Sequence, residues 1–414
     1  MNLKVFPILA ALTSSSNAID KNIQKISIPL NAPFFDLDAA VHTQWTDSIQ
    51  RVKSLEDSCP EPAPFFDFLM NIREDIGVDL FHDILELRLI DMAFFVKVVK
   101  SVVFNEGRDE DEFIGIDDVR LDRRIKESHL HQEGFWGDVK LVGVHGVELE
   151  NYDDLWRTIE IVSGLNETEA QERASQIHTL IENSSISFDH PIFSMNAVSV
   201  ADFDMILLGE GLFHFFEERE IGDGGPLYAH AHEYGHTLQV QKGIPMTPFN
   251  TTAKNSRYSE LMGDAIAAYY LVHTRGERLN DEDVKDMIET AFSVGDCAVN
   301  SDGHHGTPAQ RACAAIWGAS QSFADDSNTG TIVVGSVESS LAPVSSANDF
   351  VAGFDDALEH ILSLNNETCH FPLTAGKTKS SSKGSKGSSK VSKGAAGRKG
   401  RMNKGRRLGG TLLL

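Results

Sequence analysis

Cysteine is scarce in this chain: there are four in 414 residues, and no two of them form a C-x-x-C pair. A cysteine-ligated zinc site and a thiol–disulfide redox motif are thereby excluded, because both depend on closely spaced cysteines. An even and sparse set instead predicts two disulfides, for which three pairings exist. We expect Cys297–Cys313, which closes a short loop, and Cys59–Cys369; four buried free thiols are the alternative.

Long apolar runs are also missing, which excludes a helix that spans a bilayer. The last residues, 411–414, are too short for a lipid-anchor signal. A short apolar run, Val5–Leu12, follows Lys4 and precedes the small residues Ser16, Asn17 and Ala18. This pattern predicts a signal peptide over residues 1–18 and a secreted protein, with a buried N-terminal strand as the alternative. Four N-x-S/T sequons agree with secretion, at Asn166, Asn183, Asn250 and Asn366.

Basic residues are few outside the last 39 positions. The net charge is −24, but residues 376–414 hold twelve Lys and Arg and no acid, which leaves 25 basic against 61 acidic residues elsewhere. A body with a net charge of −36 excludes nucleic acid as a partner and suits solubility or cation binding. The Lys-, Ser- and Gly-rich tail, 376–414, is expected to be disordered. It either binds an anionic polymer or surface, or is only a solvated extension.

Apolar periodicity predicts an α+β fold that is mostly helical. Residues 19–165 are expected to form a helical N-terminal region, which is either structural or a pro-segment removed on activation. Its expected helices span Thr46–Asp57, Ala63–Glu74, Asp79–Phe104 and Asp153–Val162. The third is apolar on most of its surface and should be a buried centrepiece. Val139–Glu148 alternates like a strand, and Arg108–Glu112 reads as a solvated loop.

Residues 166–375 are expected to form a second domain, which carries the chemistry. Strands are predicted at Ser194–Val200 and Asp204–Gly209, on either side of a turn at Ala201-Asp202, and later at Thr329–Val337. Helices are predicted at Glu167–Glu182, Glu210–Glu220, Pro226–Gln241, Arg257–Thr274, Asn280–Ser293, Pro308–Phe323 and Asp349–Leu364.

The central motif is His232-Glu233-Tyr234-Gly235-His236, an H-E-x-x-H. On a helix, residues four apart share a face, so His232 and His236 can bind one metal ion. Glu233 lies one step round the helix, where a carboxylate can take a proton from water. His230 lies on another side of the helix and is expected to be a core or surface histidine. A chance match is the alternative, because the chain is rich in His and Glu.

A further ligand is offered by Glu260 and Asp264, which are four apart on the next expected helix. One of them can bind metal while the other accepts the free ring N–H of a ligand histidine. The alternative for such a pair is a solvated helix face.

These two motifs together resemble the H-E-x-x-H … E-x-x-x-D signature of the gluzincin-type zinc metallopeptidases. Asn196-Ala197 is similar to their edge strand, and Gly303–Arg311 resembles the H-G-(S/T)-x-x-Q-R stretch of the neutral zinc metallopeptidases. The resemblance covers Pro191–Trp317 and implies a zincin-like domain, in which a small sheet accompanies the motif helix. One departure is Gly263, which stands where alanine is common.

The resemblance implies one catalytic Zn²⁺, held by His232, His236 and Glu260, with Asp264 orienting a histidine. It also implies Glu233 as general base and Asn196 and Ala197 as the strand that pairs with an extended substrate.

An oxyanion formed during peptide hydrolysis needs a hydrogen-bond donor besides the metal. The candidates are His304, His305, Tyr234 and Tyr258, and the resemblance favours His305, which Asp302 is placed to orient. A plain surface loop is the alternative for the two histidines.

The expected function is therefore that of a secreted zinc-dependent endopeptidase acting on peptides or proteins. Two other functions stay open: a catalytically silent zinc-binding protein, and an extracellular matrix or surface-associated protein in which the acidic body and the basic tail act.

Overall fold

The structure is a computed structural model that describes residues 63–104, 119–244, 246, 248–296, 303–328, 347–363 and 369. Several predictions concern residues outside these ranges. They are the signal peptide 1–18, the helix Thr46–Asp57, the loop Arg108–Glu112, the strand Thr329–Val337 and the tail 376–414. No helix in the described ranges is both long enough and apolar enough to cross a membrane.

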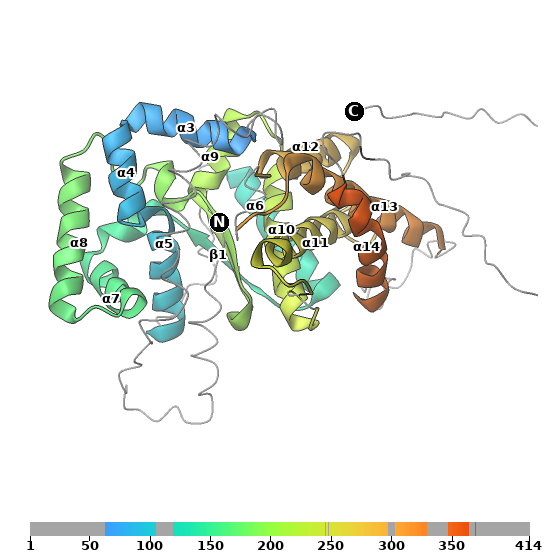
Figure 1. The fold of residues 1–414 in the computed structure, drawn as a ribbon, viewed down its shortest axis with the longest axis horizontal. Helices are drawn as coiled ribbons and strands as arrows, with labels where there is room; N and C mark the ends of the chain where they lie inside the picture. Colours follow the sequence, from blue (N-terminus) through green and yellow to red (C-terminus); the bar gives the residue numbers. More distant parts are fainter. Residues whose placement is uncertain are drawn as a thin grey trace, which may run out of the picture.

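The fold is mostly helical with one small sheet, as the periodicity predicts. Figure 1 shows the sheet and helix α10 in the middle, with the N-terminal helices on one side and the C-terminal helices on the other. The N-terminal side contains α3 (Pro64–Ile76), α4 (Val78–Glu86), α5 (Leu89–Val98), a π-helical turn (Val99–Val103), α7 (Tyr152–Ser163) and α8 (Glu167–Glu182).

The helix expected over Asp79–Phe104 is in fact broken, and that prediction is wrong in its continuity. Arg88 adopts a left-handed conformation with φ 58°, which ends α4 and lets α5 start in a new direction. The second piece, α5, does form a centrepiece, because six of its ten residues are buried. It packs against β1 and against a 3₁₀ turn over Pro191–Ser194.

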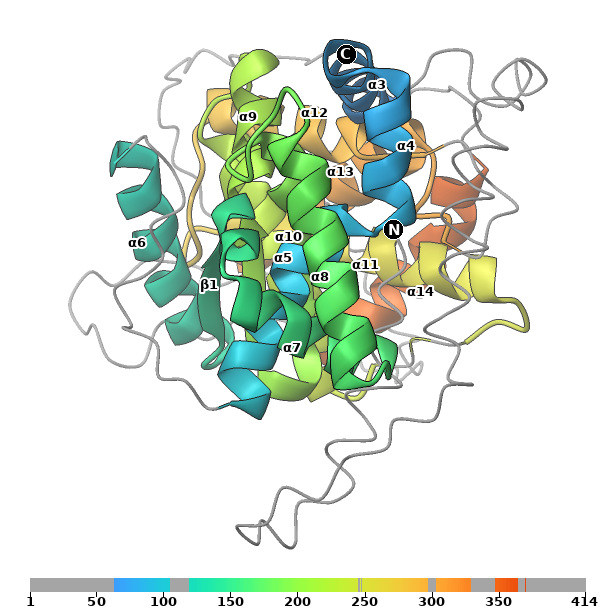
Figure 2. The same ribbon diagram turned by 90° about the vertical axis from the view of Figure 1, so that its left-hand side faces the viewer.

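Helix α6 (Val119–Trp136) has no counterpart in the predictions from sequence. Its composition is mainly polar, so its apolar stripe is narrow. Figure 2 shows α6 beside β1. Its buried His129 lies with Nδ1 3.0 Å from Nε2 of His230 on α10, which places His230 in the core, away from the face that carries His232.

The sheet has three strands in the order β1-β3-β2. β1 (Lys140–Val144) runs parallel to β3 (Met205–Gly209), and β2 (Ala197–Val200) runs antiparallel to β3 along the other edge. Every residue of β3 is buried, as expected for a central strand covered on both faces. Helix α10 packs against β2 and β3, and α5 packs against β1.

Five of the six described helices on the C-terminal side start within two residues of the prediction, but the helix expected from Arg257 starts five residues earlier, at Thr252, where the side chain of Thr251 caps it. Asn280, for example, accepts hydrogen bonds from the backbone N–H groups of Glu282 and Asp283 and begins α12. The set comprises α9 (Glu210–Glu218), α10 (Gly224–Gln241), α11 (Thr252–Val272), α12 (Asp281–Ser293), α13 (Pro308–Asn328) and α14 (Ala347–Leu362).

The expected boundary at residue 165 lies between α7 and α8, which pack against each other. One hydrophobic core runs from Phe68 to Ile361 across this boundary. The sheet crosses it as well, because β1 comes from the N-terminal region while β2 and β3 follow residue 166. These contacts favour a structural role for the N-terminal region over that of a removable segment.

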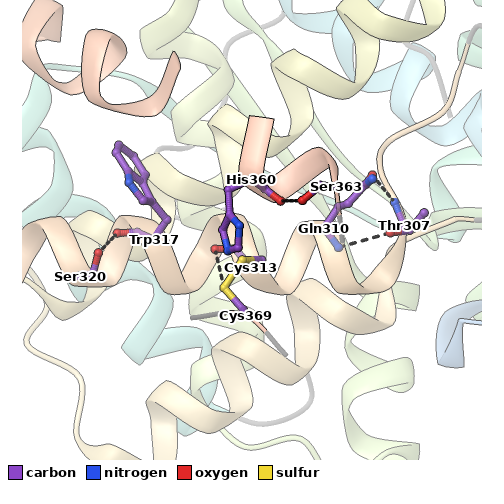
Figure 3. Close-up of a disulfide and its surroundings, with 8 residues drawn as sticks. All are labelled: Thr307, Gln310, Cys313, Trp317, Ser320, His360, Ser363 and Cys369. Carbon is purple, nitrogen blue, oxygen red and sulfur yellow. Dashed lines mark hydrogen bonds between the residues drawn. A yellow bond between two sulfur atoms is a disulfide. The ribbon is translucent and has the colours of Figure 1, made fainter. Parts of the chain in front are cut away.

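Cys313 is bonded to Cys369, with 5.4 Å between their Cα atoms, so both expected pairings are wrong. The reason lies in α14, whose end returns to the start of α13: the side-chain amide of Gln310 donates to the carbonyl of Leu362. The chain after α14 therefore reaches Cys313, one turn beyond Gln310, and Figure 3 shows the bridge at this point. Sequence separation alone favours the short loop, which the packing of α14 overrides.

Candidate metal centre

The H-E-x-x-H motif lies in the second half of α10, a helix buried along most of its length. Its first turn consists of Gly224, Gly225 and Pro226. A Cβ on Gly224 would come within 2.1 Å of the carbonyl oxygen of Asp283, so only glycine lets α10 start against α12. Pro226 lacks only an N–H that has no helical partner in the first turn.

Helices α10 and α11 cross closely at two glycines. A Cβ on Gly235 would lie 3.2 Å from the carbonyl oxygen of Gly263. A Cβ on Gly263 would lie 3.0 Å from Cε1 of His232 and 3.2 Å from Cε1 of His236. The glycine at position 263 therefore has a local reason: both imidazole rings occupy the space where an alanine methyl group would point.

Three side chains meet at this crossing. Nε2 of His232 lies 3.0 Å from Nε2 of His236 and 3.3 Å from Oε2 of Glu260, and Nε2 of His236 lies 3.5 Å from Oε1 of Glu260. All three potential ligand atoms lie within 4.8 Å of one another. His232 is buried, and the other two are partly buried. This group could hold a metal ion, as the two motifs predict.

Asp264 lies behind the group, on the far side of the His232 ring. Its Oδ1 is 2.9 Å from Nδ1 of His232, so the carboxylate accepts the ring N–H and leaves Nε2 directed at Glu260. Asp264 is fully buried and also accepts hydrogen bonds from the hydroxyl of Tyr228 (2.5 Å) and from Arg311. The arrangement fixes both the tautomer and the orientation of His232.

Arg311, on α13, was not predicted to take part. Its Nε donates to Oδ2 of Asp264 at 2.9 Å, and its second terminal nitrogen donates to Oδ1 at 2.6 Å. The same nitrogen is 3.5 Å from both ring nitrogens of His232, so the guanidinium lies against the imidazole. The signal was present in the sequence, because Arg311 ends the Gly303–Arg311 stretch.

The side-chain amide of Gln239 orients the ring of His236. Nδ1 of His236 lies 3.0 Å from Oε1 of Gln239, which also accepts from the hydroxyl of Ser259. The amide nitrogen of Gln239 in turn donates to the backbone carbonyl of Ser259 on α11. Gln239 thus ties the metal-binding face of α10 to α11, a role that no motif indicates.

The charges of the group are strongly coupled. Burial alone would lower the pKa of His232, but hydrogen bonds to Asp264 and Glu260 outweigh it and raise the pKa to about 9. Burial alone would raise the pKa of Glu260, but positive charge on His236 and His305 and hydrogen bonds from both motif histidines hold it well below its usual range. Glu260 is therefore ionised at neutral pH, as a metal ligand must be.

Glu233 is nearly buried, with 9% of its surface exposed, and its negative charge helps to raise the pKa of His236. Its helix is anchored to the sheet by Thr237, whose hydroxyl is 2.8 Å from that of Ser199 in β2. Ala197 begins β2, an edge strand of the described sheet, and the carbonyl of Asn196 accepts from Gly209. The motif helix and this edge strand are thus held together.

The four candidate oxyanion donors have different surroundings. The hydroxyl of buried Tyr234 donates to the carbonyl of Gly137, and the hydroxyl of Tyr258 donates to Asp355 at 2.9 Å. Both phenols are therefore committed elsewhere.

The two histidines share one carboxylate, that of Asp296. Nδ1 of His304 lies 2.5 Å from Oδ1, while the backbone N–H and Nδ1 of His305 lie 2.7 and 3.0 Å from Oδ2. Asp296 therefore orients His305, a role that the sequence suggested for Asp302, which lies outside the described residues. His304 is fully buried, and only His305 keeps partial exposure.

A capping box holds this stretch in place. Thr307 and Gln310 bond reciprocally, since the backbone of Gln310 donates to the Thr307 hydroxyl and the backbone of Thr307 donates to the Gln310 amide oxygen. α13 therefore starts at a defined residue, with His305 before the cap and Arg311 in the first turn.

In comparisons with known proteins, the chain matches no protein-family model, no curated protein and no solved structure. Two imidazole nitrogens, each oriented by a neighbour, and one carboxylate form a donor set that could hold a metal ion.

Proposed function

We propose that this protein is a secreted zinc-dependent endopeptidase. The observation that carries the proposal is the convergence of His232, His236 and Glu260 at the crossing of α10 and α11, with Glu233 on the adjoining side of α10. The Cys313–Cys369 disulfide supports an oxidising, extracellular location.

Zinc held by these three side chains would supply Lewis acidity and would make a bound water acidic enough to ionise near neutral pH. The protein's own residues then divide the work. Glu233 accepts the proton of the attacking water and later delivers it to the leaving amine. Asp264 and Gln239 accept hydrogen bonds from Nδ1 of the two histidines, which would leave Nε2 of each ring to bind the ion.

In this proposal His305 donates a hydrogen bond from Nε2 to the oxyanion that forms on the scissile carbonyl. Its Nδ1 is held by Asp296, so the ring is fixed before substrate arrives. Asn196 and Ala197, at the start of the edge strand β2, are proposed to pair with an extended peptide substrate through their backbone.

Two measurements test the proposal. The purified full-length chain should contain one zinc ion per molecule by elemental analysis, and it should cleave a general protein substrate such as casein. Glu233→Gln should retain the zinc and lower kcat by several orders of magnitude, because the carboxylate that moves the proton is lost.

A zinc-loaded wild type without hydrolysis would favour the silent metal-binding alternative. A wild type with no bound zinc after loading would favour a surface-associated protein without a metal centre. Retained activity in Glu233→Gln would remove Glu233 from its proposed role.

A further inference from the structure

A third charged residue continues the row that Glu260 and Asp264 form on α11. Arg257 precedes Glu260 by three positions, as Glu260 precedes Asp264 by four, so the three side chains follow one face of the helix. The rise per residue puts Arg257 about 4.5 Å from Glu260 along the helix axis. Arg257 therefore lies one turn from the metal-binding group.

Arg257 is half-buried, yet none of the described residues forms an ion pair or a side-chain hydrogen bond with it. This is unusual in a chain whose body holds 61 acidic and 25 basic residues. Burial lowers the pKa of Arg257, and the negative charge of Asp296 acts in the opposite direction.

Asp296 is the acid whose charge affects the pKa of Arg257, but its carboxylate already accepts hydrogen bonds from other residues. It accepts from Nδ1 of His304, from Nδ1 of His305 and from the backbone of His305. His305 also acts electrostatically on Glu260. Arg257 therefore lies near the carboxylate that holds His305, and its guanidinium has donors to offer an anion.

We propose that Arg257 binds a carboxylate of the peptide substrate. A guanidinium can hold a carboxylate through two parallel hydrogen bonds, which fixes direction as well as charge. The carboxylate belongs either to the C-terminus of the substrate or to an Asp or Glu side chain near the cleaved bond. This proposal rests on the peptidase function proposed above, and it adds the class of substrate.

The test uses one peptide, taken from a sequence that the enzyme cleaves in casein, in three forms. The first has a free C-terminus and no acidic side chain, the second has an amidated C-terminus, and the third is amidated with one Glu beside the cleaved bond. Wild type should cleave the first or the third with a kcat/KM about tenfold or more above the second.

Arg257→Met should abolish that preference, mainly through a higher KM for the carboxylate form, and Arg257→Lys should restore part of it. The matched control is Arg219→Met, which removes an exposed arginine at the end of α9. It should leave the preference unchanged. A preference for the first form identifies the C-terminus as the source, and a preference for the third identifies a side chain.

Equal cleavage of all three forms by wild type would overturn the proposal, as would an unchanged preference in Arg257→Met. If zinc-loaded wild type cleaves no peptide, the peptidase function fails, and Arg257 is tested by binding instead. Fluorescent copies of three forms of one casein-derived peptide are then titrated with the zinc-loaded protein. Tighter binding of a carboxylate form that Arg257→Met abolishes supports the proposal, and equal binding of all forms overturns it.

Discussion

Arg311 and Asp264 form a buried ion pair directly behind His232. Two nitrogens of the guanidinium lie 2.9 and 2.6 Å from the two carboxylate oxygens, and neither side chain is more than 5% exposed. The pair links α13 to α11 and, through Asp264, to the ring of His232 on α10. Three helices therefore meet at one carboxylate, which has consequences for metal binding and for stability.

Asp264→Asn should weaken metal binding by about 10- to 100-fold, because the amide is a poorer acceptor for the N–H of His232. Competition with a chromophoric chelator at neutral pH measures the change. Asp355→Asn is the control, since Asp355 contacts Tyr258 and none of the metal-binding group. An unchanged affinity in Asp264→Asn would mean that the carboxylate does not support the ligand.

Arg311→Met should lower the free energy of unfolding of the metal-free protein by about 3–5 kcal/mol, because it leaves the Asp264 carboxylate buried without its ion-pair partner. Urea denaturation followed by circular dichroism measures this loss. Arg120→Met breaks an ion pair with Asp223 in which the arginine is 68% exposed, and it should cost about 1 kcal/mol or less. Similar losses in both variants would contradict the importance of the buried pair.

Gly263→Ala should weaken metal binding and lower stability by about 1–3 kcal/mol, because its methyl group would press on the rings of His232 and His236. Thermal denaturation and chelator competition measure the two effects. Gly353→Ala, in α14, is the matched control: among the described residues its new methyl group would meet only Trp317, at 3.4 Å. This second change should be neutral or stabilising, since alanine favours helix over glycine. If Gly263→Ala changed neither metal affinity nor stability, α10 and α11 could move apart without cost to the site.

The His129–His230 pair should make the protein acid-sensitive. Burial lowers the pKa of His129 to about 4 and that of His230 well below its usual value, whereas both titrate near 6.5 in the unfolded chain. Below pH 6.5 the unfolded chain binds more protons, so these groups reduce stability as the pH falls from 6.5 towards 4. The contribution of His129 alone is about 3 kcal/mol over that window.

Urea denaturation of the metal-free protein at pH 7, 5.5 and 4.5 checks this expectation. His129→Gln should show a smaller loss of stability between pH 7 and 4.5 than wild type does. His214→Gln removes a histidine that is 48% exposed, and its pH dependence should match that of wild type. An identical slope in His129→Gln and wild type would contradict the pKa assigned to His129.

Local patterns predicted the elements that have strong local signals. The span of α8 was predicted to the residue, because its Asn166–Glu169 capping box is a short-range feature. The polar helix α6 was missed, since its burial depends on contacts with α10 that the sequence does not display. The break at Arg88 was missed for a related reason: the left-handed backbone there ends a helix that periodicity alone would continue.

The sequence by itself determined which residues can bind a metal ion, because helical spacing already puts His232 beside His236 and Glu260 near Asp264. Only the tertiary structure decided that these two helices cross at Gly235 and Gly263, and that Arg311 and Asp296 support the site. It also decided that Cys313 pairs with Cys369. The physical reason is range: hydrogen bonds and spacing within a helix act over a few residues, whereas packing between helices joins positions that no local pattern relates.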